Sequence, residues 1–442
     1  MVALLFYIIY FLMFPLAFMP LLKNGKYTYL SMLPLLFFPH FNSICFLKLG
    51  LTFSYFEVYL FLLCFIILIK GFNYKHLFIF DTAGKIFIIF LAISLLSIVI
   101  AHIRISIGDL TPNLKLEHAP IARSLMSLNR VFVYPILLNM IRIFYKERGV
   151  DIHKYFILFL ALSGIFPTIA TYMQACGIEF TMLFNNPSYA ILGILTPNRP
   201  FGLSYEASFY SIMCLFSFIG AYYAMEYKYI NRTKSMLLML FYFFGTILCI
   251  SRTGMLILLV FVIWKNYQSI GIKKVMLALI LLFVLSQIEV MGFNIIERFT
   301  SSFDDGADAS NIERFGSAYA LVELALDKAL LFGVGIYNYG YYILDYVPAE
   351  LLALKNYSLK DEVVSFNFIV QLFAEWGGFI FSCFIIYVFR LLSSNKQFVF
   401  MADWFLFFAV VSFSVQFMNF SLPFLIILYS PNLRINKHLI NA

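Results

Sequence analysis

Two clusters in the middle of the chain place arginine beside glycine or a carboxylate, a combination that could do chemistry. The first runs from 198 to 208 and contains Arg199, Gly202 and Glu206. A carboxylate in the first turn of a helix is held ionised by the helix dipole. Glu206 could therefore act as a base toward a hydroxyl group or as a structural partner of Arg199. The second cluster is Ser251-Arg252-Thr253-Gly254, a turn between two apolar segments where arginine requires a wet cavity or a partner.

A third cluster combines two arginines with a glycine-rich segment. Arg298 and Arg314 precede the sequence 333–340, Gly-Val-Gly-Ile-Tyr-Asn-Tyr-Gly. The glycine spacing does not fit a dinucleotide-binding fingerprint, and no strand is predicted before it. We expect these glycines to shape a loop. Arg298 and Arg314 could bind an anion or pair with the neighbouring acids Glu297 and Glu313.

The fourth cluster is a polar face on an apolar helix. Asn367, Gln371 and Glu375 follow one another at intervals of four residues, which places them on one side of a helix. A carboxylate deep in a membrane is neutral, paired or exposed to a polar cavity. The face could form interhelical hydrogen bonds, or Glu375 could serve as a base. Arg130, two turns inside another predicted helix, could bind a lipid phosphate or pair with a carboxylate such as Glu375.

The type of basic residue differs between two sets of loops. Lysine supplies 14 of the 19 basic residues in the first set, which comprises the loops between 23 and 26, 70 and 85, 142 and 154, 226 and 234, and 265 and 274, and those near the C-terminus. Of the other 12 basic residues, seven are arginine. The planar guanidinium group suits bidentate binding of phosphate and carboxylate, whereas membrane topology needs only positive charge. The second set therefore suggests an anionic ligand, with pairing to local acids as the alternative; its arginines are Arg104, Arg123, Arg130, Arg199, Arg252, Arg298 and Arg314.

These clusters must be positioned by membrane-spanning helices. The 442 residues are 62% hydrophobic and 12% charged, about half the charged fraction of a soluble domain. Because a helix needs roughly 20 apolar residues to cross a bilayer, we predict an all-α polytopic integral membrane protein with about twelve or thirteen transmembrane helices. The predicted spans are 2–22, 27–47, 51–69, 86–101, 124–144, 155–175, 203–224, 235–250, 253–265, 275–292, 363–390, 398–416 and 420–431.

The lysine-rich loops lie in the cytoplasm by the positive-inside rule. The segments 102–123, 176–202, 251–254 and 293–362 are then external. We predict a single membrane domain over 1–442, a retained first span, and one large external loop at 293–362. Within that loop the apolar spacing predicts an amphipathic helix near 312–331 that packs on the membrane domain. The residues that carry this spacing are Ala318, Leu321, Val322, Ala325, Leu326, Ala329 and Leu330.

Several functions are not supported by the sequence. The net charge of +8 is scattered through short loops, which is typical of a membrane protein and not of a nucleic-acid-binding surface. The six cysteines and six histidines show no metal-ligand or disulfide pattern, so we expect no metal and no cofactor. A Walker A loop and a DxD pair that would hold a metal against a nucleotide-sugar are both absent.

With these motifs in view, the sequence resembles the superfamily of O-antigen polymerases (Wzy) and O-antigen ligases, bacterial membrane glycosyltransferases. The resemblance covers 195–380 and rests on the order of the four clusters relative to the spans. Its residues are Arg199, Gly202 and Glu206; Ser251-Arg252-Thr253-Gly254; Arg314 with Gly333-Val334-Gly335; and Asn367 with Ala374-Glu375-Trp376-Gly377.

The resemblance implies a glycosyltransferase of the bacterial inner membrane with its active face in the periplasm. Its donor would be an undecaprenyl-pyrophosphate-linked oligosaccharide, and its partners would be membrane lipid and a chain-length regulator. The family's pyrophosphate-binding arginines correspond to Arg199, Arg252 and Arg314, with Arg298 and Arg130 as further candidates. Glu206 and Glu375 are the carboxylates that could act as the catalytic base.

One departure from the family pattern favours polymerase over ligase. Ligases carry a histidine in the periplasmic loop, often just before the asparagine that opens the next helix. Here Phe366 precedes Asn367, and 293–362 contains no histidine. We therefore expect polymerisation of repeat units into O-antigen or a related surface polysaccharide. The alternatives are an O-antigen ligase that transfers polymer to lipid A-core and, from another class, a flippase for lipid-linked oligosaccharide.

Overall fold

Long apolar segments form helices over most of the chain that the structure, a computed structural model, describes. The described residues are 18, 28–32, 46–49, 51–71, 82–113, 119–178, 200–202, 204, 207–266, 289–290, 293–294, 309–355 and 367–393. Only two short antiparallel hairpins interrupt the helices of this part: β1 (Phe46–Leu49) with β2 (Leu51–Ser54), and β3 (Glu289–Val290) with β4 (Phe293–Asn294). The expected all-α class is thus confirmed at this level.

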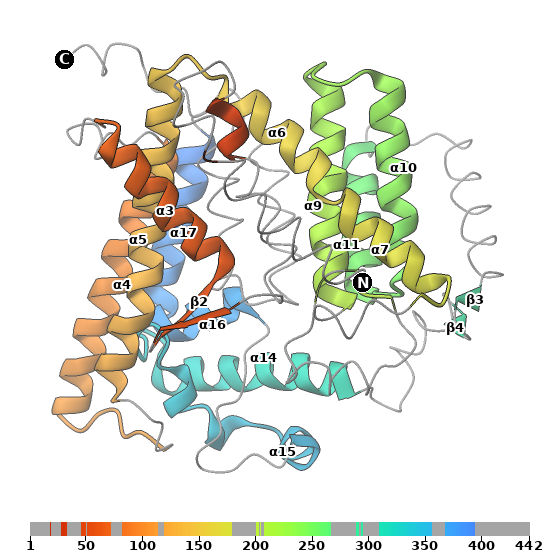
Figure 1. Cartoon of the computed structure of the whole chain (residues 1–442). Helices are drawn as coiled ribbons and strands as arrows, with labels where there is room; N and C mark the ends of the chain where they lie inside the picture. The colour runs from red at the N-terminus through yellow and green to blue at the C-terminus, as the bar shows by residue number, and fades with distance from the viewer. Residues whose placement is uncertain are drawn as a thin grey trace. The chain divides into compact units, whose positions relative to one another are not determined.

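The chain divides into two compact units, each built from two separate stretches of sequence. The first comprises Met1–Asn73 and Met140–Ser301, and the second comprises Tyr74–Asn139 and Ser302–Ala442. Helix α5 (Pro120–Glu147) contributes to both. Figure 1 shows the helices of each unit. The single membrane domain expected over 1–442 stays a prediction.

The first unit is centred on one buried helix, α9 (Ala207–Glu226), and packs α6, α10 and α11 around it. Small residues allow the close approach: a Cβ on Gly220 would lie 2.8 Å from the Ala161 nitrogen in α6, and one on Gly254 would lie 2.5 Å from Ser211 Cβ. Small residues at contacts of this kind are typical of membrane helices. The other helices of the unit are α3 (Tyr55–Ile69), α6 (Ile152–Ser163), α7 (Ile165–Ala175), α10 (Arg232–Leu248) and α11 (Arg252–Asn266), with the short η1 (Thr28–Met32).

The predicted span 155–175 is a broken helix. Gly164 separates α6 from α7, and Pro167 in the first turn of α7 has no backbone N–H to continue the hydrogen-bond ladder. Ser163 Oγ lies 3.0 Å from Ser217 Oγ of α9, and Gly164 packs against the same serine. The break between α6 and α7 therefore lies in direct contact with α9.

The second unit sets a transverse helix against the ends of apolar ones. In Figure 1, α14 (Ala309–Lys328) lies across the direction of α4 (Thr82–Ser106) and α17 (Gly378–Ser393). The core of the unit lies between α14, α16 and the segment after α14, and includes Leu321, Leu324, Tyr342, Ile343 and Ala374. Its remaining elements are η6 (Tyr339–Tyr341), η7 (Leu344–Tyr346), α15 (Ala349–Lys355) and α16 (Phe368–Trp376).

The amphipathic helix expected at 312–331 is α14, shifted by about one turn. Leu321, Ala325 and Ala329 are buried as predicted. Val322, Leu326 and Leu330 are exposed instead, because the helix carries apolar residues on two faces and only one of them packs on the unit.

Within the described part of the chain, three helices are long and apolar enough to cross a membrane: Ile88–Ser106, Ile152–Ala175 and Ala207–Glu226. Shorter apolar helices cover Tyr59–Ile69, Gly254–Lys265 and Gly378–Arg390. The predicted span 363–390 is not one helix, since α16 ends at Trp376 and α17 begins at Gly378. The predicted spans 2–22, 275–292, 398–416 and 420–431 lie largely or wholly outside the described residues.

Candidate functional site

The break between α16 and α17 is the centre of the candidate site in the second unit. Gly377 adopts φ +90°, a backbone conformation that favours glycine. A Cβ on Gly377 would lie 2.6 Å from the Gly333 nitrogen, and one on Gly333 would lie 2.0 Å from the Glu375 carbonyl oxygen. The glycine-rich segment after α14 is therefore pressed directly onto the end of α16.

Hydrogen bonds join the chain after α14 to backbone groups at the end of α16 and the start of α17. Val334 N donates to Ala374 O at 3.2 Å and Gly335 N donates to Glu375 O at 3.0 Å. On the other side of the break, the amides of Gly378 and Phe379 donate to the carbonyls of Ala329 and Leu330 at 3.2 and 3.1 Å. Helix ends leave such groups unsatisfied, so the contact supplies partners that a continuous helix would not need.

Glu375 lies in the last turn of α16 and is fully buried. Gln371 Nε2 donates to Glu375 Oε1 at 3.1 Å. Asn367 caps the helix, accepting from Val370 N at 3.1 Å. The polar face predicted for this segment is thus formed, with Asn367 as its cap and the Gln371–Glu375 pair inside.

The second unit contains further buried polar atoms on α16 and in the segment after α14. Among the described residues, no hydrogen-bond partner is present for Gln371 Oε1, Trp376 Nε1, Asn338 Oδ1 or the Tyr342 hydroxyl. Burying such groups without a partner costs roughly 1–3 kcal/mol each, and water or a polar ligand would remove that cost. Burial raises the pKa of Tyr342 to about 12, while the nearby Arg104 guanidinium acts in the opposite direction.

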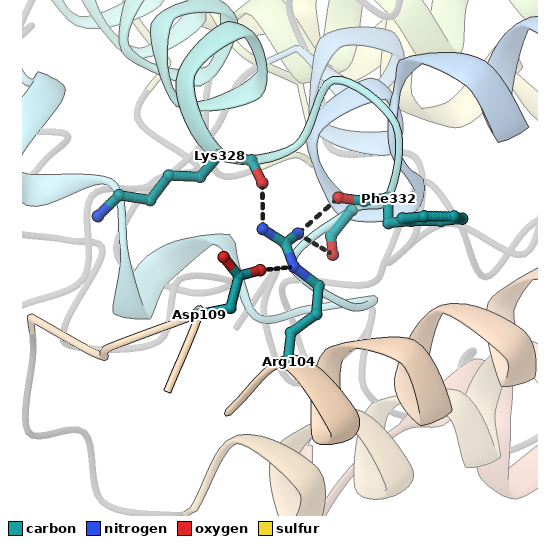
Figure 2. A network of polar contacts seen from close by, with 5 residues as sticks. Arg104, Asp109, Lys328 and Phe332 are labelled. Atoms are coloured by element: carbon teal, nitrogen blue, oxygen red, sulfur yellow. Dashed lines mark hydrogen bonds and ion pairs between the residues drawn. The ribbon is translucent and has the colours of Figure 1, made fainter. Parts of the chain in front are cut away.

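Arg104 fastens the glycine-rich segment to α4 (Figure 2). Its Nη2 donates to Lys328 O at 2.6 Å, and its Nη1 donates to Phe332 O at 2.7 Å and Gly333 O at 3.2 Å. Its Nε contacts Asp109 Oδ2 at 2.5 Å. Cations near a helix C-terminus stabilise its free carbonyls. The sequence places Arg104 among the arginines that suggest an anionic ligand. In the structure its guanidinium group instead binds backbone carbonyls and the Asp109 carboxylate.

A second fastening holds Ile336. Its N–H donates to Ser97 Oγ of α4 at 3.3 Å, and its carbonyl accepts from Ser124 Oγ of α5 at 2.7 Å. No sequence pattern singles out these serines, because single serines are common in apolar helices. The segments 102–123 and 293–362, predicted to lie on the same side of the membrane, also meet at Asn113 N, which donates to Tyr341 O at 2.7 Å.

Arg314 lies on α14 and is partly buried. It precedes Ser317 by three residues and Leu321 by seven, so it extends the face of α14 that packs on the unit. Both of those residues are fully buried. Arg130 lies within α5, and its helix position is all that the structure describes of it.

The described parts of the other two clusters both lie in the first unit. Gln174 of α7 holds the start of the first cluster: its Oε1 accepts from the amides of Phe201 and Gly202, each at 2.9 Å. Ser211 of α9 donates to Ser251 Oγ at 2.9 Å. Arg252 is the first residue of α11, and Ser251 just before it contacts the first turns of α9. Arg199, Glu206 and Arg298 lie outside the described residues.

The described residues of the first and second clusters lie in the first unit, and those of the third and fourth clusters lie in the second unit. In the second unit a buried carboxylate, Glu375, lies against a glycine-rich segment and a helix that carries Arg314. In the first unit a serine-lined contact joins the start of α9 to the start of α11. No protein-family model matches this chain, and no curated protein or solved structure shows a significant match.

Proposed function

We propose that this protein is a polytopic membrane glycosyltransferase that polymerises undecaprenyl-pyrophosphate-linked oligosaccharides at the periplasmic face of the bacterial inner membrane. The observation that carries the proposal is the seating of the glycine-rich segment, at Gly333 and Gly335, on the backbone of the buried Glu375. Two motifs far apart in the sequence, which are shared in order with the polymerase superfamily, are in direct contact. The three apolar helices support the membrane part of the proposal.

The reaction would be a direct displacement at the anomeric carbon of the donor. An acceptor hydroxyl oxygen attacks this carbon, the bond to the pyrophosphate oxygen breaks, and the lipid pyrophosphate leaves with the electron pair. Glu375 or Glu206 accepts the hydroxyl proton. Arginines stabilise the charge that develops on the leaving group. In this scheme Arg199, Arg252 and Arg314 bind the pyrophosphate, with Arg298 and Arg130 as further candidates.

The surroundings of Glu375 hold its carboxylate in place, since it is fully buried and accepts a hydrogen bond from Gln371 Nε2. The unsatisfied polar atoms of Gln371, Asn338 and Tyr342 provide groups that a sugar hydroxyl or a water could bind. Asn367 and Gln371 then act by fixing the helix and the carboxylate, respectively.

The test is deletion of the gene, followed by electrophoresis of the envelope glycans with and without the wild-type gene restored. A polymerase predicts core carrying a single repeat unit in the deletion strain and a ladder of longer chains after restoration. Long lipid-linked polymer with bare core would identify a ligase instead. Loss of periplasmic lipid-linked units would identify a flippase. Either of these results would overturn the proposal.

A further inference from the structure

Helix α14 carries a second apolar face, which the described residues of its unit leave exposed. This outer stripe consists of Phe315, Tyr319, Val322 and Leu326 on one side of the helix, followed by Leu330 just beyond its end at Lys328. Their exposed fractions run from 36% for Val322 to 73% for Phe315. The opposite side, including Leu321 and Leu324, is fully buried. From Phe315 to Leu326 the row is about 17 Å long at 1.5 Å per residue, and such a row is unusual on a surface in contact with water.

The outer stripe is continuous with exposed apolar residues at the ends of other helices. Leu331 and Phe332 extend it at 61% and 47% exposure. Phe379 at the start of α17 is 60% exposed and donates its N–H to Leu330 O at 3.1 Å. Ile107 lies just beyond α4, three residues after Arg104, and is 72% exposed. The stripe therefore joins the surface of the helices that it crosses.

One of those helices is a candidate membrane span. Within Ile88–Ser106, Leu95, Leu96, Val99 and Ile103 are 44–55% exposed and form one side of α4. Since α14 crosses the direction of α4 (Figure 1) and is bound to its end through Arg104, α14 lies at the level where that span leaves the membrane. A transverse helix at this level has its apolar side in reach of lipid.

We propose that α14 is an interfacial helix whose outer stripe inserts into the lipid bilayer at the boundary between headgroups and acyl chains. The proposal rests on the membrane assignment of α4 that forms part of the proposed function, and it does not depend on glycosyl transfer. Tyr is enriched at this boundary, and Phe is common on the apolar side of interfacial helices, so Tyr319 and Phe315 both suit the position. Helix α14 contains three acidic and two basic residues, Glu313, Glu323, Asp327, Arg314 and Lys328. Insertion is therefore driven by the apolar stripe and not by anionic lipid.

The consequence would be to hold the long external loop against the membrane surface. Arg314, next to Phe315 in α14, would then lie at the depth of lipid phosphate groups. This is the depth at which the pyrophosphate of a lipid-linked donor would be presented. The outer stripe would thus determine the depth of Arg314, a candidate pyrophosphate-binding residue, relative to the bilayer.

The test uses single spin labels on the full chain in phosphatidylcholine nanodiscs, after replacement of the six native cysteines. Labels at Tyr319→Cys, Val322→Cys and Leu326→Cys report on the stripe. Asp327→Cys is the matched control, because Asp327 is also exposed but lies about 100° around the same helix. Val99→Cys on α4 reports separately on the membrane assignment. The measurement is the accessibility of each label to oxygen, which enters lipid, relative to a water-soluble nickel chelate.

We expect the oxygen-to-nickel ratio at the three stripe positions to exceed that at 327 several-fold, with no change when anionic phosphatidylglycerol is added. A lipid-like ratio at 99 with a water-like ratio along the stripe would overturn the interfacial helix alone. Low accessibility of the stripe to both reagents would also overturn it, because protein would then cover the stripe. A water-like ratio at 99 would overturn it together with the membrane assignment.

Discussion

Gly333 and Gly377 lie in backbone contact, although 43 residues of sequence separate them: a Cβ on Gly377 would come within 2.6 Å of the Gly333 nitrogen. Such a contact leaves no room for a side chain on either residue. It also brings the segment after α14 close enough for four backbone hydrogen bonds across the break between α16 and α17. The candidate site therefore depends on two glycines as much as on its carboxylate.

Replacing Gly333 by alanine should destabilise the second unit, because the new Cβ would meet the backbone of Glu375 and Trp376, which cannot rotate away. We expect a loss of about 3 kcal/mol, the upper end for overpacking. Thermal unfolding in detergent can be followed by tryptophan fluorescence, since Trp376 is fully buried at this contact. Gly316→Ala is the control, because its Cβ would meet only the Leu351 side chain, at 3.1 Å. Equal unfolding temperatures for both variants would contradict the contact.

Arg104→Lys should weaken the fastening of the glycine-rich segment while preserving charge. A lysine ammonium cannot reach the Lys328, Phe332 and Gly333 carbonyls together with Asp109 as the guanidinium does. We expect a loss of about 2 kcal/mol from hydrogen bonds to a charged donor. Asp109→Asn should cost under about 1 kcal/mol, since Asp109 is half exposed. The unfolding temperatures of the two variants check the order, and a larger drop for Asp109→Asn would refute it.

Glu375→Gln should abolish chain extension while leaving the protein folded. The amide has nearly the shape of the carboxylate, and its oxygen can still accept from Gln371 Nε2, but it cannot accept a proton from a sugar hydroxyl. Polysaccharide length in a complemented deletion strain measures the effect, and the amount of folded protein in the membrane is measured beside it. Glu323→Gln, on α14, is the matched control and should extend chains normally. Normal chains in Glu375→Gln would remove Glu375 from the list of bases.

Arg314→Lys and Arg252→Lys should shorten the polysaccharide although each keeps its charge, because bidentate binding of a pyrophosphate needs the guanidinium fork. A loss of one charge-assisted hydrogen bond, about 1.5–3 kcal/mol, corresponds to roughly a tenfold or larger drop in rate. Arg232→Lys is the control. Arg232 is the first residue of α10, and the charge pattern predicts that the loop before it is cytoplasmic. Wild-type chain lengths in both test variants would contradict the assignment of these arginines.

The sequence predicted the helices with a clear apolar pattern better than the connections between them. The span at 86–101 corresponds to α4. The turn expected at 251–254 lies instead at 249–251, because α10 ends at Leu248 and α11 already begins at Arg252. The break at Gly377 was missed, because Gly377 and Gly378 lie within a continuous apolar run. The glycine pair was the only indication of a break in the helix. Two adjacent glycines end a helix reliably only where another backbone packs against them. That backbone comes from Gly333, too distant in sequence for any local pattern to show.

Among the site residues, too, local spacing predicted contacts within a helix but not contacts between distant segments. The spacing of Asn367, Gln371 and Glu375 predicted a shared helix face, and this spacing is what a helix converts into contacts. Arg104 could not be separated from the other arginines, because its role depends on carbonyls that the fold brings to it. Ser97 and Ser124 carry no pattern at all, since each is defined only by its contact with Ile336.

The interruption after Trp376 also changes how the second unit should exchange its amide hydrogens. The first amides of a helix usually exchange fastest, because no preceding carbonyl protects them. At the start of α17 the amides of Gly378 and Phe379 are instead bonded to the carbonyls that follow α14. Their protection therefore reports on a different part of the chain: deuterium should enter at 378 and 379 only when the segment from 329 to 335 lifts away, so that opening of the loop and fraying of the helix become one event.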